Sequence, residues 1–158
     1  MENSECIIRK IEKQDLKNLI KLCSKHADYE ALFFDEDPEL IKRWEQLFFS
    51  ANSKIYCWVC VNQKNHIIGY MSVTIDYSTW SALPFLYLDC LYLQEEYRKK
   101  GLGKRLIATL ENFAFEKNIN SIEWQTPPDN IIGINFYQAI GAKALDKKRF
   151  KLIVPKVK

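Results

Sequence analysis

The sequence has few residues of the kinds that bind metal ions or cross-link chains. Among 158 residues there are two histidines, His26 and His66, and five cysteines. Cys57 and Cys60 have the C-x-x-C spacing but lie in a run typical of a strand, where residues three apart point to opposite faces. No second such pair is present to complete a zinc site. We therefore expect no metal and no disulfide framework, which favours a reducing compartment, the cytoplasm.

Long apolar runs and a broad basic surface are also missing. No run approaches the roughly 20 apolar residues that span a bilayer, and residues 1–5 do not resemble a signal peptide. The net charge is only +3, and the basic residues are scattered apart from residues 98–105 and the C-terminal tail, unlike a nucleic-acid-binding face. We expect neither a membrane nor a nucleic acid as partner. The length and the absence of repeats or linkers predict a single domain, residues 1–158.

Hydrophobic periodicity predicts a mixed α/β protein with helices on the faces of one sheet. The expected order is β-α-α-β-β-β-α-β-α-β-β. Strands are expected at 7–10, 54–61, 67–76, 85–93 and 121–126, and 142–145 pairs with 149–154 as a terminal hairpin. Helices are expected at 15–27, from Asp37-Pro38 to about Phe48, at 103–117 and at 131–140, the last ending at Gly141.

The most informative segment is the turn after the strand at 85–93. Residues 98–105 read Arg-Lys-Lys-Gly-Leu-Gly-Lys-Arg and lead into a helix. The glycines allow backbone N–H groups to converge, and the helix adds unpaired N–H groups and its positive dipole end. This pattern predicts a pyrophosphate site. Its spacing matches neither the dinucleotide fingerprint nor the P-loop.

Arg-x-x-Gly-x-Gly after a strand resembles the acyl-CoA loop of the GNAT family of N-acetyltransferases. A second segment, Asn-Phe-Tyr-Gln-Ala-Ile-Gly-Ala at 135–142, resembles the family's N-F-Y-x-x-x-G-A signature. The resemblance spans nearly the whole chain and implies the acyl-CoA N-acyltransferase fold, with acetyl-CoA as cosubstrate. Within the family, residues 28–30, 77–80 and 87–89 resemble the spermidine/spermine (diamine) acetyltransferases, which are often dimers, so a homodimer is expected.

The resemblance also implies roles for individual residues. Tyr137 is the expected general acid that protonates the leaving thiolate, although a core aromatic is the alternative reading of this residue. The expected cofactor residues comprise a strand end that pairs with the pantetheine arm, a loop that holds the pyrophosphate, and two residues from the later segment: Leu91, Tyr92, Leu93, Arg98, Lys99, Lys100, Gly101, Leu102, Gly103, Lys104, Asn130 and Tyr137.

Four residues are expected on the amine side: Tyr29, Glu30, Trp80 and Asp89. The family carries glutamate where this chain has Asp89, so the shorter acid contacts the amine directly or through water, or else serves a structural pairing. Tyr29 and Glu30 match a substrate-binding pair, or else lie on a solvated acidic face. Trp80 either lines the pocket or anchors its loop in the core.

The chemistry of amine acetylation fits this set. An alkylamine with a pKa near 10.4 is almost fully protonated at pH 7 and must lose a proton before it attacks the thioester. We expect an N-acetyltransferase acting on a primary amine of a small cationic substrate, a polyamine, diamine or lysine-like amino acid. The alternatives are a protein or aminoglycoside N-acetyltransferase, or a non-catalytic acyl-CoA sensor.

Overall fold

A five-stranded sheet organises the first part of the chain. The computed structural model describes residues 6–155, and the chain divides into two compact units, 1–127 and 128–158. The strands are β1 (Ile7–Lys10), β2 (Ile55–Val61), β3 (Ile67–Ser78), β4 (Leu83–Leu93) and β5 (Ile122–Trp124). They lie in the order β1-β2-β3-β4-β5; β4 and β5 are parallel and the other pairs are antiparallel.

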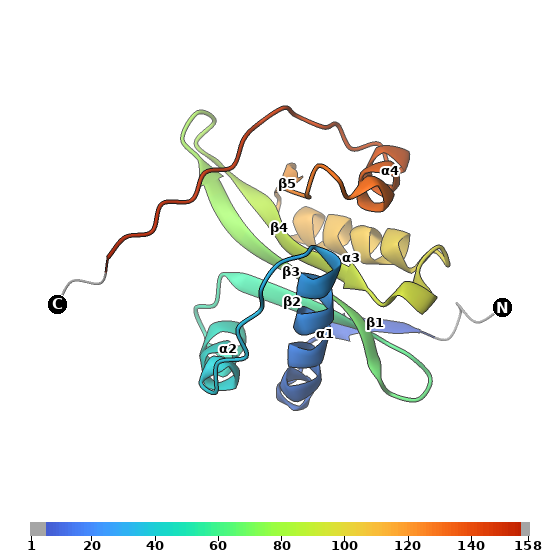
Figure 1. Cartoon of the computed structure of the whole chain (residues 1–158). Helices are drawn as coiled ribbons and strands as arrows, with labels where there is room; N and C mark the ends of the chain where they lie inside the picture. The colour runs from blue at the N-terminus through green and yellow to red at the C-terminus, as the bar shows by residue number, and fades with distance from the viewer. Residues whose placement is uncertain (1–5, 156–158) are drawn as a thin grey trace. The chain divides into compact units, whose positions relative to one another are not determined.

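Helices cover both faces of this sheet (Figure 1). On one face, α1 (Leu16–Tyr29) and α2 (Leu40–Phe49) pack against alternate residues of β2, namely Cys57, Val59 and Val61. The intervening residues face α3 (Leu102–Glu116), where Trp58 meets Phe113 edge to face at 5.0 Å. The two thiols of the C-x-x-C segment therefore lie on opposite faces, as the strand period predicts. Among the described residues, no helix is both long and apolar enough to cross a membrane.

Most predicted elements are confirmed, with shifted ends. The second helix begins at Leu40, because the Asp37 carboxylate accepts a hydrogen bond from Glu39 N–H at 2.8 Å and closes a turn before the helix. β3 and β4 continue beyond the ends expected at residues 76 and 85, to the pair Ser78 and Leu83, so only a tight turn separates them. Two 3-10 turns, Lys13–Asp15 and Glu95–Tyr97, precede α1 and α3.

The second unit holds α4 (Ile131–Ala139) and the segment after it. Gly141, with a φ of 90°, ends the helix as predicted. The predicted terminal hairpin is wrong: residues 142–155 contain no strand, and Leu145, Phe150 and Leu152 are exposed. A two-stranded hairpin alone is marginally stable, and the Asp-Lys-Lys turn expected at 146–148 has no glycine to favour a tight hairpin turn.

Candidate active site

A β-bulge in β4 places Asp89. Ser72 pairs with Cys90 and Val73 pairs with Leu88, so Asp89 is an extra residue without a partner in β3. Bulges bend a strand and redirect its side chains. Asp89 is exposed rather than buried in its apolar strand, and its Oδ2 accepts a hydrogen bond from the Cys90 thiol at 3.7 Å. The carboxylate is therefore open to a substrate or to water.

Beyond the bulge, one edge of β4 is open. β5 pairs only with residues Leu86 to Leu88, and within residues 6–155 no strand pairs with β4 beyond that point on this side. In an antiparallel pair, the backbone groups of successive residues point alternately toward and away from the neighbouring strand. Gln94 N–H donates to Ile68 C=O, so the backbone groups of Leu91 and Leu93 point away from β3. An extended amide-containing arm, such as pantetheine, fits this edge as an added strand. Tyr92 was also predicted to pair with the pantetheine arm, but its backbone groups point toward β3.

The loop between β4 and α3 has the geometry of an anion site. Lys99 and Gly101 both adopt left-handed conformations, with φ of 57° and 81°. The first hydrogen bond of α3 runs from Arg105 N–H to Gly101 C=O. By helix geometry the N–H groups of Leu102, Gly103 and Lys104 have no partner inside the helix and point out of its positive end. These residues fit a pyrophosphate.

Arg98 lies at the other side of the same loop. Its guanidinium Nε donates to Leu93 C=O at 2.8 Å, and its Cζ lies 4.4 Å from the centroid of the Tyr29 ring and 5.4 Å from that of Tyr92. Arg98 was predicted to accompany the pyrophosphate. The structure places its side chain beside the rings of Tyr29 and Tyr92, so one cation links the loop before α3 to the end of α1.

The end of α1 brings two predicted residues into this cluster. Tyr29 is the last residue of α1 and Glu30 caps it. Glu30 Oε1 lies 3.3 Å from His26 Nε2, and the Glu30 side chain is 25% exposed. The Glu30 carboxylate is therefore in contact with His26 on one side and accessible to solvent on the other.

His26 is the site residue that sequence reasoning missed. Its ring stacks on Tyr92 at 5.0 Å and 22°, and its Nδ1 lies 2.7 Å from the Tyr70 hydroxyl. The pKa of His26 is lowered overall, mainly because the ring is buried. The negative charges of Glu30 and Asp89 act to raise this pKa, and the positive charge of Arg98 acts to lower it. A signal was present, because His26 follows Leu22 and Cys23 by four and three residues and so shares their buried helix face.

Tyr137 and Asn130, the remaining predicted cofactor residues, lie in the second unit. The Tyr137 ring is half-buried on α4 and lies 5.5 Å from the Phe136 ring. Asn130 caps α4, because its Oδ1 accepts a hydrogen bond from Gly133 N–H at 3.1 Å. A Cβ on Gly133 would displace the Asn130 amide, so a larger residue there would disturb this cap.

Trp80 does not join the cluster at the end of α1. It lies in the turn between β3 and β4, which leads to the strand end at Leu83, and its side chain is 99% exposed. It therefore does not anchor the loop in the core. From Leu83 to Asp89 the strand advances six residues, roughly 20 Å at about 3.3 Å per residue.

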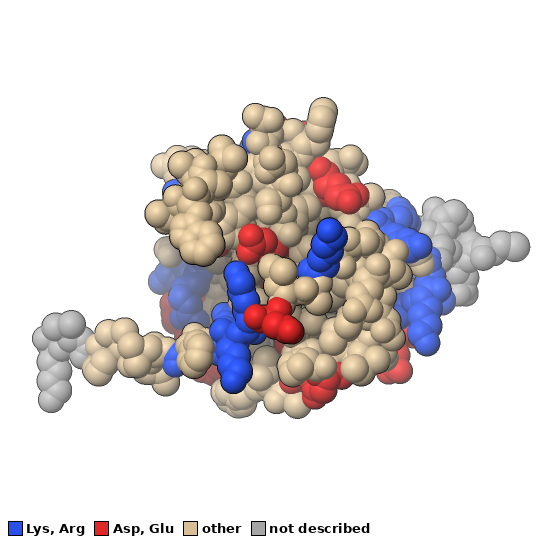
Figure 2. Space-filling view, turned by 90° about the horizontal axis from the view of Figure 1, so that it is seen from above, with Lys and Arg blue, Asp and Glu red and all other residues tan. Residues whose placement is uncertain are grey.

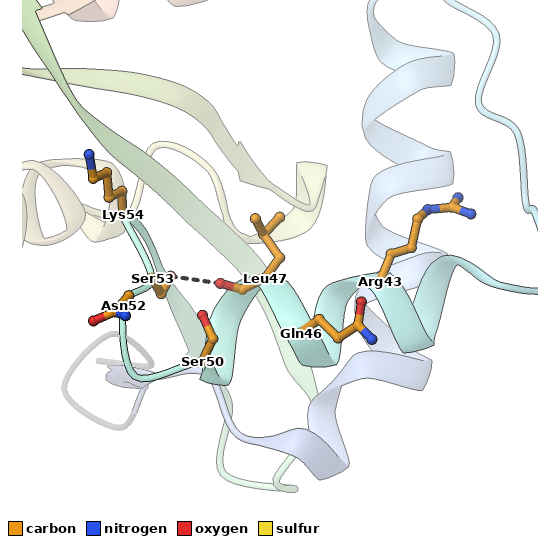
Figure 3. A pocket seen from close by; sticks show the side chains of 7 residues that line it. All are labelled: Arg43, Gln46, Leu47, Ser50, Asn52, Ser53 and Lys54. Atoms are coloured by element: carbon orange, nitrogen blue, oxygen red, sulfur yellow. Dashed lines mark hydrogen bonds between the residues drawn. The ribbon is translucent and has the colours of Figure 1, made fainter.

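Two other surface features, a depression beside α2 and the charged side chains in Figure 2, do not form an alternative catalytic site. A depression of about 450 Å³ lies beside the end of α2 (Figure 3). The Ser53 hydroxyl there donates to Leu47 C=O at 2.6 Å, so it is engaged in fixing the turn. The depression is lined by Arg43, Gln46, Leu47, Ser50, Asn52, Ser53 and Lys54. On the face in Figure 2, basic side chains stand at several separate places with acidic ones between them.

Comparison with known proteins decides the family. The sequence matches the acetyltransferase (GNAT) family over residues 16–142, most of its length. The chain belongs to the GNAT acetyltransferase family. It is therefore an N-acetyltransferase with acetyl-CoA as the acetyl donor.

Relatives of this acetyltransferase are distant in sequence. Thialysine N-epsilon-acetyltransferase of Sus scrofa is 25% identical over 150 residues, which cover 88% of this chain and 85% of the relative. L-ornithine N5-acetyltransferase of Arabidopsis thaliana is 28% identical over 83 residues, 52% of this chain and 36% of the relative.

Solved structures show the same fold. An aminoglycoside N-acetyltransferase in complex with CoA has a TM-score of 0.76 at 19% identity, covering 94% of each chain. A possible acetyltransferase from Clostridium difficile 630 has a TM-score of 0.78 at 22% identity, covering 96% of this chain and 99% of the other. The predicted fold class is thus confirmed.

Proposed function

We propose that this acetyltransferase acetylates one primary amine of a small substrate that carries a second positive charge: a polyamine, a diamine or a lysine-like amino acid. The observation that supports this most is one partly exposed carboxylate beside the His26 ring, with a second, exposed carboxylate near enough to raise the pKa of that ring. Glu30 lies 3.3 Å from His26, and the charge of Asp89 acts on the same imidazole. Two carboxylates in one region are complementary in charge to a substrate with two cationic groups.

The aromatic rings and Arg98 refine this proposal. Arg98 already lies over the rings of Tyr29 and Tyr92. A substrate cation is then recognised by the carboxylates rather than by these ring faces, and the positive charge of Arg98 disfavours cations that approach without a carboxylate partner. The names of two relatives, for thialysine and L-ornithine acetylation, agree with a substrate that has two amines.

In the proposed reaction, Asp89 takes a proton from the reacting ammonium, directly or through one water molecule. The neutral amine nitrogen forms a bond to the acetyl carbon, the bond from that carbon to sulfur breaks, and the nitrogen releases its surplus proton to water to give the amide. Tyr137 donates its hydroxyl proton to the departing thiolate and regains one from solvent. Acetyl-CoA supplies the activated acyl group. Glu30 keeps the second ammonium charged and in place.

The test is a comparison of matched amines by release of the coenzyme thiol, which a colour reagent for free thiols detects. Putrescine and n-butylamine have the same four-carbon chain and differ in one terminal amine. We expect putrescine to have the higher kcat/KM, by about tenfold or more for one charged hydrogen bond. Equal values for the two amines would refute the proposal while leaving acetyltransferase activity intact.

The proposed enzyme is a homodimer. Exposed apolar side chains in the segment after α4, among them Leu145, Phe150 and Ile153, support association. Light scattering on a size-exclusion column is expected to give twice the mass of 18.7 kDa, and a monomer at micromolar concentration would contradict this.

A further inference from the structure

The cluster at the end of α1 contains a hydrogen-bonded series that the reaction described above does not use. The Tyr70 hydroxyl lies 2.7 Å from His26 Nδ1, and His26 Nε2 lies 3.3 Å from Glu30 Oε1. We propose that His26 is a positioning residue: the Tyr70 hydroxyl donates to Nδ1, Nε2–H donates to Glu30, and this series aims the Glu30 carboxylate at the second ammonium of the substrate. The inference rests on the proposed function of Glu30.

Donor and acceptor chemistry determines the direction of the series. An ionised carboxylate only accepts, so His26 Nε2 must carry a proton. In a neutral imidazole Nδ1 is then an acceptor, and its partner must donate, which a tyrosine hydroxyl does. Burial strongly raises the pKa of Tyr70, so the hydroxyl keeps its proton. Burial also lowers the pKa of His26, which agrees with a neutral ring.

Packing holds the ring in one orientation. The His26 side chain is 13% exposed, and Tyr70 is 4% exposed. The imidazole is stacked on Tyr92 and meets the edge of Tyr70 at 5.7 Å and 70°. A half-turn of the ring about Cβ–Cγ would put carbon atoms in the places of Nδ1 and Nε2 and break both hydrogen bonds, and the packing against two tyrosines opposes it.

Orientation of Glu30 has a measurable consequence for binding. A glutamate on a helix end has many side-chain conformations, and a substrate that immobilises it bears that entropic cost. Because His26 already restricts the Glu30 side chain in the folded protein, the substrate does not have to order it on binding. Loss of the series is expected to weaken binding of the second ammonium about two- to tenfold, the equivalent of one immobilised side chain.

The kinetic test uses three substitutions with graded chemistry. Tyr70→Phe removes only the hydroxyl, and His26→Leu removes both ring nitrogens, whereas His26→Gln keeps an N–H donor near the position of Nε2. We expect the ratio of KM for putrescine to KM for n-butylamine to rise two- to tenfold in Tyr70→Phe and His26→Leu, with partial recovery in His26→Gln. His66→Gln, an exposed histidine at the start of β3, is the matched control.

A spectroscopic test needs no substrate. The chain has two histidines, so nitrogen NMR of the protein labelled at histidine gives two pairs of ring signals, and His66→Gln assigns them. We expect His26 at pH 7 to be neutral with the proton on Nε2, and Tyr70→Phe to shift its Nδ1 signal. A proton on Nδ1, or a charged ring at pH 7, would overturn the series.

The outcomes separate the two proposals. If the unmutated enzyme shows no preference for putrescine, the proposed function fails. If it prefers putrescine but the KM ratio is the same in Tyr70→Phe and His26→Leu, then Glu30 binds the second ammonium without help from His26, and this inference alone fails.

Discussion

The Arg98 guanidinium donates from Nε to Leu93 C=O at 2.8 Å and covers the Tyr29 ring at 4.4 Å. This one side chain connects three parts of the protein: the open end of β4, the loop before α3 and the C-terminal end of α1. A hydrogen bond from a charged donor to a backbone carbonyl contributes roughly 1.5–3 kcal/mol. Arg98 thereby couples the residues predicted to hold the acetyl donor to those predicted to hold the amine.

We predict that Arg98→Lys lowers the free energy of unfolding by about 1 kcal/mol or more, because an ammonium lacks the planar fork that bonds and stacks at once. Urea unfolding measures the change. Lys104→Gln, an exposed residue in the first turn of α3, is the control and is expected to change stability by less than about 0.5 kcal/mol. Equal stabilities of Arg98→Lys and the unmutated protein would mean that the bond to Leu93 is not needed.

A second prediction concerns the ion pair that joins β1 to the start of α1. Arg9 contacts both oxygens of Asp15, at 2.7 and 3.0 Å, and Glu12 N–H donates to Asp15 at 2.8 Å. Burial alone would raise the pKa of Asp15, but the hydrogen bonds from Arg9 and Glu12 bring it below its ordinary value. We expect Asp15→Asn to cost about 1–3 kcal/mol at pH 7.

The pH dependence follows from the direction of that shift. Because the pKa of Asp15 is lower in the folded protein, its stabilisation is complete above the unfolded pKa, about 3.9, and is lost as the pH falls through the folded value. The stability difference between Asp15→Asn and the unmutated protein should therefore shrink below about pH 4. Asp37→Asn, which removes an exposed pair with Arg43, is the control and should matter less. A difference that stays constant down to acid unfolding would contradict the assignment.

A third prediction tests the pyrophosphate site. Gly103→Asp adds a negative charge at the first turn of α3, which suits the helix dipole but repels a bound phosphate. We expect a folded protein with at least tenfold weaker acetyl-CoA binding by calorimetry. Gly103→Ala is the control for the loss of glycine alone. Unchanged affinity in folded Gly103→Asp would show that the donor binds elsewhere.

A fourth prediction addresses the general acid. Tyr137→Phe removes only the hydroxyl, so we expect kcat to fall about 10²–10⁴-fold with acetyl-CoA affinity mostly kept. Phe136→Leu, next to it on α4, serves as the control for packing. A loss below about threefold would support the alternative that Tyr137 is a packing residue and that water protonates the thiolate.

A fifth prediction concerns the second ammonium. Glu30→Gln keeps an oxygen that accepts from His26 but removes the charge, so we expect a higher KM for putrescine and little change for n-butylamine. Asp35→Asn, in the exposed acidic stretch before α2, is the control. If Asp35→Asn and Glu30→Gln have the same effect on putrescine, the acidic stretch acts only by general attraction.

The sequence predicts the sheet, its helices and the glycine-containing turn before α3 well, because each depends on local periodicity or on glycine. Leu16, Leu19 and Leu22 repeat at helical spacing and are all buried, and Gly101 adopts the left-handed conformation that an N–H-rich turn needs. Family resemblance selected Tyr29, Glu30 and Asp89, which share one region with Arg98.

What the sequence does not predict depends on partners distant in the chain. His26 and Tyr70 are 44 residues apart, and nothing in either local pattern indicates that they meet. Trp80 is exposed because β3 and β4 continue together to Ser78 and Leu83, and strand length depends on pairing rather than on local composition. The prediction of a terminal hairpin was wrong for the same reason, because an alternating pattern such as that at 149–154 forms a strand only where another strand pairs with it.

The bulge at Asp89 has a consequence for how the gene can tolerate length changes. Opposite residues share a face, so Leu88 lies on the same side as Val73, whereas Cys90 and Tyr92 lie on the side of Ser72 and Tyr70. Removing the codon for Asp89 would leave Leu88 opposite Val73 and Cys90 opposite Ser72, so β4 would become a continuous strand and Tyr92 would still lie on the side of Tyr70 and His26. A codon lost from the turn at 79–82 would leave every strand facing as before. Deletion scanning should therefore find that loss of codon 89 keeps the fold and removes only the exposed carboxylate and the bend of the strand.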